Sequence, residues 1–350
     1  MNRAKLLKAL EALNTAVAGK PILAEQGCYR IKGKTLRASD GVSLVQAELD
    51  EDTGLDCTVP ASHLYKLIKG LGNPDVMLTV TEDNKLAVKT DKVRGRYALE
   101  AGPGMLDDLD FAVDTWADCP DGLKSGVAKC RFAASKDSSR QVYCGVLVKG
   151  DSVLASDGIR IACLKAKVQL SEQPVILSAD AAALLDRKAT EIKQWGVKGG
   201  SVYFKADGVI YGCRNVVGNY TDKVWAFLTK SDTLDKRLTF PAIARDVIVR
   251  HMDQMTEVLE MDREVEVKVD GKTMIVHSTD GVRYDLEEEL ELATPLDVPV
   301  QLKAHPACLA DILTTTKEMR YADGVIFVAF VTETAAGEFR YLTTVERPKA

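Results

Sequence analysis

The sequence has no long apolar run. No hydrophobic stretch approaches the roughly 18 residues that a helix needs to cross a bilayer, so we expect no membrane partner. The N-terminal residues are charged and follow a helical pattern without the apolar core of a secretion signal. These absences lead us to expect a cytoplasmic protein.

Paired metal-binding and redox motifs are also missing. No two of the eight cysteines form a Cys-x-x-Cys pair, and the four histidines are isolated from one another. We therefore expect free buried thiols in a reducing compartment, and no metal or other cofactor.

The sequence lacks the common catalytic signatures. There is no P-loop for phosphate and no His-Glu-x-x-His motif. Ser-Asp-Gly occurs twice, beginning at Ser39 and Ser156, whereas a catalytic serine normally occurs once with a base beside it. We expect no enzymatic activity.

A repeated stretch organises the chain. Residues 149–161 and 32–44 are identical at six of 13 positions, and Ser278-Thr279-Asp280-Gly281 begins a looser third copy. The matching glycines Gly41, Gly158 and Gly281 lie 117 and 123 residues apart. This spacing predicts three tandem modules, at 1–118, 119–235 and 236–350.

Each module is expected to contain two helices and two sets of short strands. Apolar residues at helical spacing, such as Leu6, Leu10 and Leu13, indicate the helices. Between the helices, short runs of alternating apolar and polar residues are separated by Asp-Gly or Gly, which is a hairpin pattern. This order predicts an α+β fold of helices packed on antiparallel sheets. The predicted helices are 2–20, 63–71, 133–140, 179–194, 241–255 and 306–320, and 101–124 is a predicted linker.

The net charge of −5 hides an uneven distribution. The predicted helices, with their flanking residues, carry 17 Lys and Arg against nine Asp and Glu, so strands and loops hold the negative excess. A basic helical surface would attract nucleic-acid phosphates without reading sequence. Alternatively, Lys and Arg are simply favoured on solvated helix faces. Charge alone leaves both interpretations open.

Several motifs, in order, resemble the bacterial DNA polymerase III beta subunit, the sliding clamp, in a divergent or phage-encoded form. Gly19-Lys20-Pro21-Ile22-Leu23 is similar to the family's Gly-Arg-Pro…Pro-Ile-Leu segment after the first helix, and Val59-Pro60-Ala61 to its second-helix entry. Residues 155–161, Ala-Ser-Asp-Gly-Ile-Arg-Ile, resemble its Ala-Thr-Asp-Gly-His-Arg-Leu signature. The resemblance covers almost the whole chain.

The resemblance implies a DNA clamp fold, with three modules forming half of a head-to-tail homodimeric ring. Such a ring encircles duplex DNA and tethers DNA polymerase as a processivity factor, after placement by a clamp loader. The alternative that we leave open is a scaffold or decoy with this fold that binds replication proteins without encircling DNA.

The resemblance also implies sites. Lys20 and Arg140 match DNA-contacting arginines of the family, and helix position adds Lys5, Lys8, Lys66, Lys69 and Lys136. Tyr97 and Leu99 match the dimer joint, although they could also pack only within the first module. The expected partner cleft contains Tyr143, Ser156, Gly158, Ile159, Arg160, Ile161, Trp225, Leu342 and Val345.

The cleft departs from the family pattern. Ile159 replaces the family's histidine, and Tyr220-Thr221-Asp222-Lys223 replaces Phe-Pro-Asp-Tyr. The Met-Pro-Met-Arg-Leu tail is absent. Since a few buried side chains anchor a docked peptide, the cleft is expected either to prefer a different motif or to have lost the role.

Overall fold

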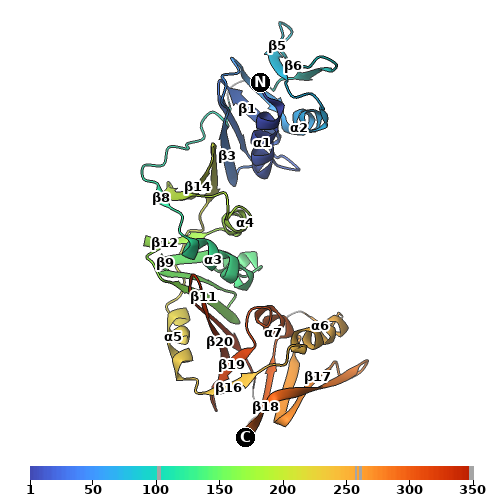
Figure 1. Cartoon of the computed structure of the whole chain (residues 1–350), viewed down its shortest axis with the longest axis vertical. Coiled ribbons are helices and arrows are strands. Elements are labelled where there is room, and N and C mark those ends of the chain that lie inside the picture. Colours follow the sequence, from blue (N-terminus) through green and yellow to red (C-terminus); the bar gives the residue numbers. More distant parts are fainter. Residues whose placement is uncertain (101–103, 257, 260–261, 347–350) are drawn as a thin grey trace. The chain divides into compact units, whose positions relative to one another are not determined.

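The computed structural model describes residues 1–100, 104–256, 258–259 and 262–346 (Figure 1). The chain divides into two compact units. Unit 1 consists of Met1–Pro120 and Asp180–Val216, and unit 2 of Asp121–Ala179 and Val217–Ala350. Each unit is described by itself, and the three predicted module boundaries remain a prediction.

Unit 1 contains an eight-stranded antiparallel sheet in the order β4-β1-β2-β3-β15-β14-β13-β8. A separate three-stranded sheet follows the order β5-β6-β7. The strands of the two sheets are β1 (Cys28–Lys32), β2 (Thr35–Ser39), β3 (Ser43–Glu48), β4 (Asp56–Pro60), β5 (Met77–Val80), β6 (Lys85–Lys89), β7 (Arg94–Ala98), β8 (Ala117–Asp118), β13 (Gln194–Lys198), β14 (Ser201–Ala206) and β15 (Val209–Arg214).

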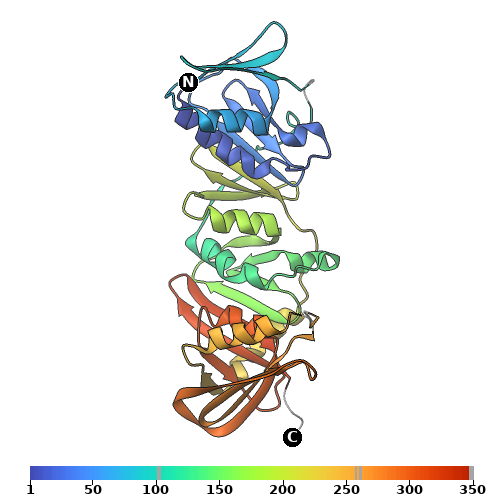
Figure 2. The same ribbon diagram turned by 90° about the vertical axis from the view of Figure 1, so that its right-hand side faces the viewer.

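Helices α1 (Arg3–Leu13) and α2 (Ala61–Gly70) pack together in unit 1, side by side in Figure 2. Leu6, Leu10 and Leu13 recur at helical spacing and are buried, as the sequence predicts. The Arg3 guanidinium donates hydrogen bonds to the carbonyls of Ile68 and Lys69, which lie in the last turn of α2. This contact satisfies carbonyls that the helix itself leaves free.

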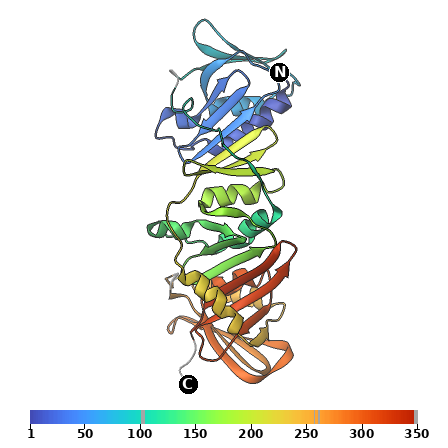
Figure 3. The same ribbon diagram turned by 90° about the vertical axis from the view of Figure 1, so that its left-hand side faces the viewer.

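Unit 2 contains a second eight-stranded antiparallel sheet, ordered β12-β9-β10-β11-β21-β20-β19-β16, and a long hairpin of β17 and β18. Helix α5 (Lys223–Lys230) lies in front of this sheet in Figure 3. The strands are β9 (Val146–Gly150), β10 (Ser152–Ser156), β11 (Arg160–Ala166), β12 (Ser171–Leu177), β16 (Lys236–Thr239), β17 (Val265–Thr279), β18 (Asp285–Ala304), β19 (Glu318–Tyr321), β20 (Phe327–Thr334) and β21 (Gly337–Thr344). The other helices of unit 2 are α3 (Asp121–Cys130), α6 (Ala244–Gln254) and α7 (Pro306–Ile312), whereas α4 (Ala179–Arg187) belongs to unit 1 except for its first residue.

The two large sheets repeat the same strand order. The set β4-β1-β2-β3 in unit 1 corresponds to β12-β9-β10-β11 in unit 2. Each set is extended at its last strand by four further strands, of which three are consecutive in the chain, β13-β14-β15 in unit 1 and β19-β20-β21 in unit 2. The repeated turns match as well, because Asp40, Asp157 and Asp280 each accept hydrogen bonds from the backbone N–H groups two and three residues later. The predicted α+β fold of antiparallel sheets is confirmed.

Several predicted elements differ from the structure. Helix α3 occupies the end of the predicted linker, and the helix predicted at 133–140 is wrong, since short 3₁₀ segments lie at Arg131–Ala133 and Ser138–Cys144. The helices predicted at 179–194 and 306–320 end earlier, at Arg187 and Ile312. Helix α5 and strand β13 were not predicted from the sequence. The alternation of apolar residues predicts separate strands at 282–292 and 298–303, but the structure has one long strand, β18.

With the helix bounds of the structure, the positive charge is concentrated on fewer helices than the sequence predicts. Helices α1, α2 and α3 carry seven Lys and Arg against two Asp and Glu. Helices α4, α6 and α7 carry three against five. Helix α5 carries two lysines and no Asp or Glu. The basic excess therefore belongs to α1, α2, α3 and α5 rather than to all six helices that were predicted.

Candidate functional site

A cavity of about 260 Å³ opens in unit 2 beside α5, and we call it the α5 cleft. Its walls come from the turn between β10 and β11, from α5, and from β20 and β21. Arg140 and Lys223 stand at the cleft, and none of its described lining residues is an Asp or Glu. The full lining is Arg140, Tyr143, Ser156, Gly158, Ile159, Ile161, Thr221, Lys223, Val224, Phe227, Ile326, Phe327, Leu342, Thr343 and Thr344.

Exposed apolar side chains supply the binding surface of the α5 cleft. Ile159 is 44% exposed, Phe227 is 38% exposed and Ile326 is 66% exposed. Phe227 also meets the ring of Phe327 edge to face, with centroids 5.7 Å apart. Exposed apolar groups in a concave surface are typical of a site that binds a peptide through a few anchoring side chains.

The repeated turn forms one wall of the cleft. Asp157 accepts hydrogen bonds from the N–H groups of Ile159 (2.9 Å) and Arg160 (3.0 Å). Gly158 has φ +92°, and a Cβ at this position would come within 2.6 Å of the Arg140 guanidinium. The positive φ therefore favours glycine here, and the absence of a Cβ lets the Arg140 guanidinium approach the turn.

Two aromatic rings hold Arg140 at the cleft. Its guanidinium lies over the Tyr143 ring, 4.8 Å from the centroid, and donates a 2.7 Å hydrogen bond to the Asp157 carbonyl. The Tyr143 ring meets Tyr220 edge to face at 5.2 Å, and the Tyr220 hydroxyl donates to the Gly145 carbonyl at 2.7 Å. Burial raises the pKa of Tyr220, so the hydroxyl remains a neutral donor.

Six of the nine residues predicted for the partner cleft line this cavity. They are Tyr143, Ser156, Gly158, Ile159, Ile161 and Leu342. Arg160 lies outside the cavity because alternate residues of a strand face opposite sides of a sheet, and Ile161 faces the cleft. Val345 is buried just after β21, and its N–H donates to the Ile326 carbonyl.

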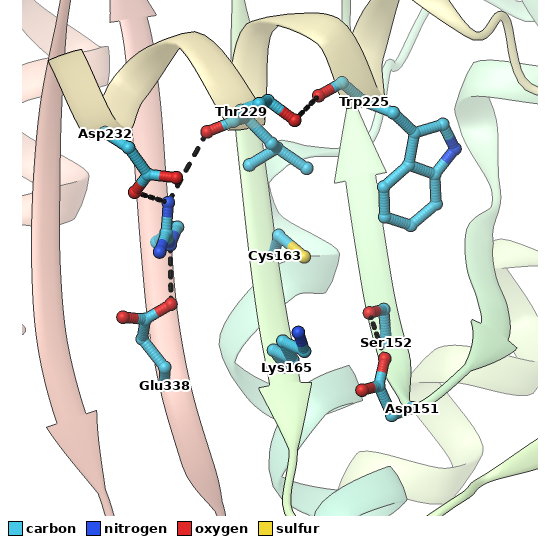
Figure 4. A pocket seen from close by; sticks show the side chains of 10 residues that line it. Asp151, Ser152, Cys163, Lys165, Trp225, Thr229, Asp232 and Glu338 are labelled. Carbon is cyan, nitrogen blue, oxygen red and sulfur yellow. Dashed lines mark hydrogen bonds and ion pairs between the residues drawn. The ribbon is translucent and has the colours of Figure 1, made fainter.

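Trp225 lines a second cavity, on the other side of α5 (Figure 4). This cavity measures about 370 Å³ and contains the carboxylates of Asp151, Asp232 and Glu338. Arg340 pairs with both Asp232 and Glu338, and the lining has three carboxylates against the two cations Lys165 and Arg340. Lys149 stands over the Trp225 ring, 5.6 Å from the centroid.

The α5 wall of the cleft, together with Ile326 and Phe327, was not predicted from the sequence. The signal was present, because Val224, Phe227 and Leu228 recur at helical spacing. It went unused because this segment was compared only with the family's Phe-Pro-Asp-Tyr stretch. Arg140, predicted to contact DNA, also lines this cleft, and its contact with DNA stays a prediction.

The predicted DNA-binding lysines occupy different local settings. Lys5 pairs with Asp50, whereas the exposed side chain of Lys69 lies over the Tyr65 ring at 5.4 Å from the centroid. Lys8 and Lys66 are exposed on α1 and α2. Lys20 and Lys136 are exposed outside the α-helices.

The predicted dimer residues Tyr97 and Leu99 are half-buried at the edge of the β5-β6-β7 sheet. The Tyr97 ring stacks on His63 of α2 with centroids 6.4 Å apart. Arg94, Arg96 and Ala98 alternate with them and are exposed. The edge therefore has an apolar side toward α2 and a basic side facing away.

The described residues contain no cluster of His, Cys, Asp or Glu arranged to hold a metal ion. All eight cysteines are free thiols, and burial raises the pKa of several, including Cys163 to about 12. Within the described part of the chain, no helix combines the length and apolar character needed to span a membrane.

Solved structures show that this is the fold of bacterial DNA clamps. The chain matches the beta subunit of DNA polymerase from Streptococcus pyogenes with a TM-score of 0.81 and 16% identity, over 99% of each chain. It also matches the sliding clamp of Pseudomonas aeruginosa (TM-score 0.80, 20% identity) and that of Caulobacter crescentus (TM-score 0.79, 20% identity), in each case over 99% of this chain and 98% of the other.

No protein-family model and no curated protein sequence matches the chain. The resemblance to the beta subunit that the sequence motifs indicate is thus confirmed at the level of the fold. Function has to be argued from the chain's own sheets, charges and cleft.

Proposed function

We propose that this protein is a DNA sliding clamp, a homodimeric ring of three-module subunits that encircles duplex DNA and tethers a DNA polymerase without catalysing a reaction. One observation carries the proposal. Two sheets are completed within the chain, and two partial sheets remain whose free edges complement one another. The matches to solved clamps over the whole chain support it.

The completed sheets define how modules join. In each, the strand after the Asp-Gly turn pairs with the last strand of a three-stranded set, as β3 pairs with β15 and β11 with β21. The remaining strand after such a turn is the start of β18, residues 285–292, and the remaining three-stranded set is β5-β6-β7. The repeat therefore predicts that β7 of one copy pairs with β18 of a second copy.

The side chains of these two edges match in charge and polarity. Exposed Arg94 and Arg96 on β7 would meet an acidic row on β18. The alternate positions carry Tyr97 and Leu99 on one edge and Leu286 and Leu290 on the other, all of them half-buried. Cross-strand pairs of opposite charge and of apolar groups stabilise a joint, and pairing also removes an exposed sheet edge. The acidic row consists of Glu287, Glu289 and Glu291.

Duplex DNA would contact the basic helices of such a ring. The basic excess of α1, α2 and α3 suits sequence-independent attraction to phosphates. A ring that slides needs this weak, non-specific contact rather than hydrogen bonds to bases. Cytoplasmic location follows from this role.

The α5 cleft would receive short peptides from the polymerase and from the clamp loader. Its apolar floor and its cations Arg140 and Lys223 favour an extended segment with two apolar side chains beside an acidic residue. The altered residues of this chain, among them Ile159 and Lys223, would set a motif preference of its own.

Loading onto DNA tests the proposal. Protein placed on a nicked circular DNA by the loader of its host should stay bound, and should leave rapidly after the circle is linearised. Equal dissociation rates from both forms would reject topological tethering and favour the alternative, a scaffold that binds replication proteins without encircling DNA.

A further inference from the structure

Comparison of the two repeated turns shows whether the Arg160 side chain is needed to form the turn. In the first copy Ser43 holds the equivalent position, yet the turn has the same hydrogen bonds. Ser39 Oγ donates to the Ser43 carbonyl at 2.8 Å, and Ser156 Oγ donates to the Arg160 carbonyl at 2.7 Å. The turn therefore forms without an arginine, and the Arg160 side chain serves another purpose.

That side chain connects three segments of unit 2. It donates to Asp157 Oδ2 within its own turn (2.9 Å), to Asp311 Oδ2 of α7 (2.6 Å) and to the Phe132 carbonyl (3.0 Å). Its guanidinium also lies 5.5 Å from the centroid of the Phe132 ring, and the side chain is 12% exposed. Bonds from one planar guanidinium to several segments fix their relative positions, which a single ammonium group cannot do.

These contacts lie behind the wall of the α5 cleft. Ile161 faces the cleft, so Arg160, the preceding residue, faces the opposite side of the sheet. On β21, Leu342 lines the cleft while the adjacent Tyr341 hydroxyl donates to the Cys308 carbonyl of α7 at 3.0 Å. Helix α7 thus binds both strands that carry the cleft walls, through Arg160 on one and Tyr341 on the other.

We propose that Arg160 is a positioning residue of the α5 cleft, which holds the turn carrying Gly158 and Ile159 at a fixed distance from the β21 wall by anchoring it to α7 and to Phe132. The importance of the cleft for partner binding rests on the proposed clamp function. The positioning of the turn by Arg160 does not depend on the clamp function.

Amide hydrogen exchange tests the positioning directly. Arg160→Met keeps an apolar stem against Phe132 and removes every donor. We expect exchange at Gly158, Ile159 and Thr344, whose N–H donates to the Ile159 carbonyl at 3.0 Å, to become about tenfold faster. The twin turn at Gly41 and Val42 is the internal control and should not change. Equal acceleration in both turns, or none in either, would overturn the proposal.

Binding of a probe peptide supplies the second measurement. The probe is a fluorescent peptide with one aspartate beside a leucine and a phenylalanine, and we expect about tenfold weaker binding to Arg160→Met, mainly through faster dissociation. Arg160→Lys should restore charge but not affinity, because Arg160 reaches its three partners through three different nitrogens and a single ammonium nitrogen cannot occupy all three positions. Full rescue by lysine would show that charge alone matters and would reject positioning.

A milder variant keeps the proposal testable if Arg160→Met fails to fold. Asp311→Asn removes one charged partner of Arg160, and Asp311 itself is 46% exposed, so the fold should persist. It should accelerate exchange at Ile159 in the same direction as Arg160→Met, and unchanged exchange would contradict the anchor to α7. The DNA-circle experiment is independent of these variants, so a failed clamp function and a failed positioning role are distinguishable.

Discussion

Gly126 of α3 lies directly against Val153 of β10. A Cβ atom at the glycine would come within 2.5 Å of the valine side chain, far inside van der Waals contact. Gly122, one turn earlier, faces Ala166 at 2.9 Å in the same way. The helix therefore reaches this sheet closely because two positions on one face have no side chain.

Gly126→Ala should destabilise the protein even though alanine is the better helix former. Helix propensity would contribute about 1 kcal/mol of stabilisation, whereas overpacking costs about 1–3 kcal/mol or more. Urea denaturation measures the change in the free energy of unfolding. Ser125→Ala, next to it in the helix, is the control and should be close to neutral. A stabilised Gly126→Ala protein would contradict the close packing.

The same glycines explain what the sequence could not predict. Glycine is typical of linkers, so residues 101–124, which include Gly122, were interpreted as one. The reason for Gly122 becomes visible only in its close approach to Ala166. The repeated Asp-Gly turns were predicted correctly because the signal is local. Each residue of such a turn needs only its neighbours to adopt its conformation.

The lining residues of the α5 cleft that belong to the Asp157-Gly158 turn could be predicted from the sequence. Those whose orientation depends on tertiary packing could not. Ser156, Gly158 and Ile159 were found through the motif. Arg160 was predicted to line the cleft, but strand alternation places it on the other face of the sheet. Trp225 was also predicted to line the cleft, but it lines the second cavity, on the other side of α5. Which side of a short helix meets which cavity depends on tertiary contacts that no local pattern encodes.

Tyr97→Asp combined with Leu99→Asp should convert the proposed dimer to monomer. Two carboxylates would be buried in an apolar joint without partners, at a cost of several kcal/mol. Light scattering should show the mass falling from twice 38.1 kDa toward 38.1 kDa. Ala98→Ser is the control, because Ala98 faces the opposite side of the same edge and serine adds no charge opposite the acidic row. A dimer that persists in the double variant would remove both residues from the joint.

Charge reversal should test the partner edge. Arg94→Glu with Arg96→Glu places like charges opposite the acidic row of β18 and should weaken dimerisation by about 10-fold or more at low salt. Adding Glu287→Arg and Glu289→Arg to the same chain should restore it, since the signs are then exchanged. Failure of the four-residue variant to recover dimer would argue against pairing of these two edges.

The lysines of α2 should contribute more to DNA binding than Lys5. Lys5 is engaged with Asp50, whereas Lys66 and Lys69 are exposed on α2. Replacing Lys66 and Lys69 by alanine should reduce the slope of log K against log salt by about 0.9 for each lost phosphate contact. Titration of duplex DNA at several salt concentrations measures this slope. A larger decrease in this slope for Lys5→Ala than for the α2 variant would show that Lys5 contributes more to DNA binding than Lys66 and Lys69.

His251 of α6 should make stability depend on pH. The ring is fully buried, its Nδ1 lies 2.7 Å from Ser278 Oγ on β17, and its Nε2 lies 3.7 Å from the Glu288 carboxylate of β18. Burial lowers the pKa of His251, and nearby His277 and Arg250 act in the same direction, which together outweigh Glu288. The folded protein therefore keeps this ring neutral where the unfolded chain, with a pKa near 6.5, begins to bind a proton.

Stability from this residue is consequently complete above the unfolded pKa and is lost as pH falls below it. The free energy of unfolding should decrease by at most about 1.4 kcal/mol per pH unit between the unfolded pKa and the lower folded one. Urea denaturation from pH 8 to pH 5 measures the slope. His251→Gln cannot titrate but can still bond Ser278, so its slope should be shallower over the same range. Identical slopes in the two proteins would mean that His251 binds its proton equally well folded and unfolded, and that its burial has no electrostatic cost.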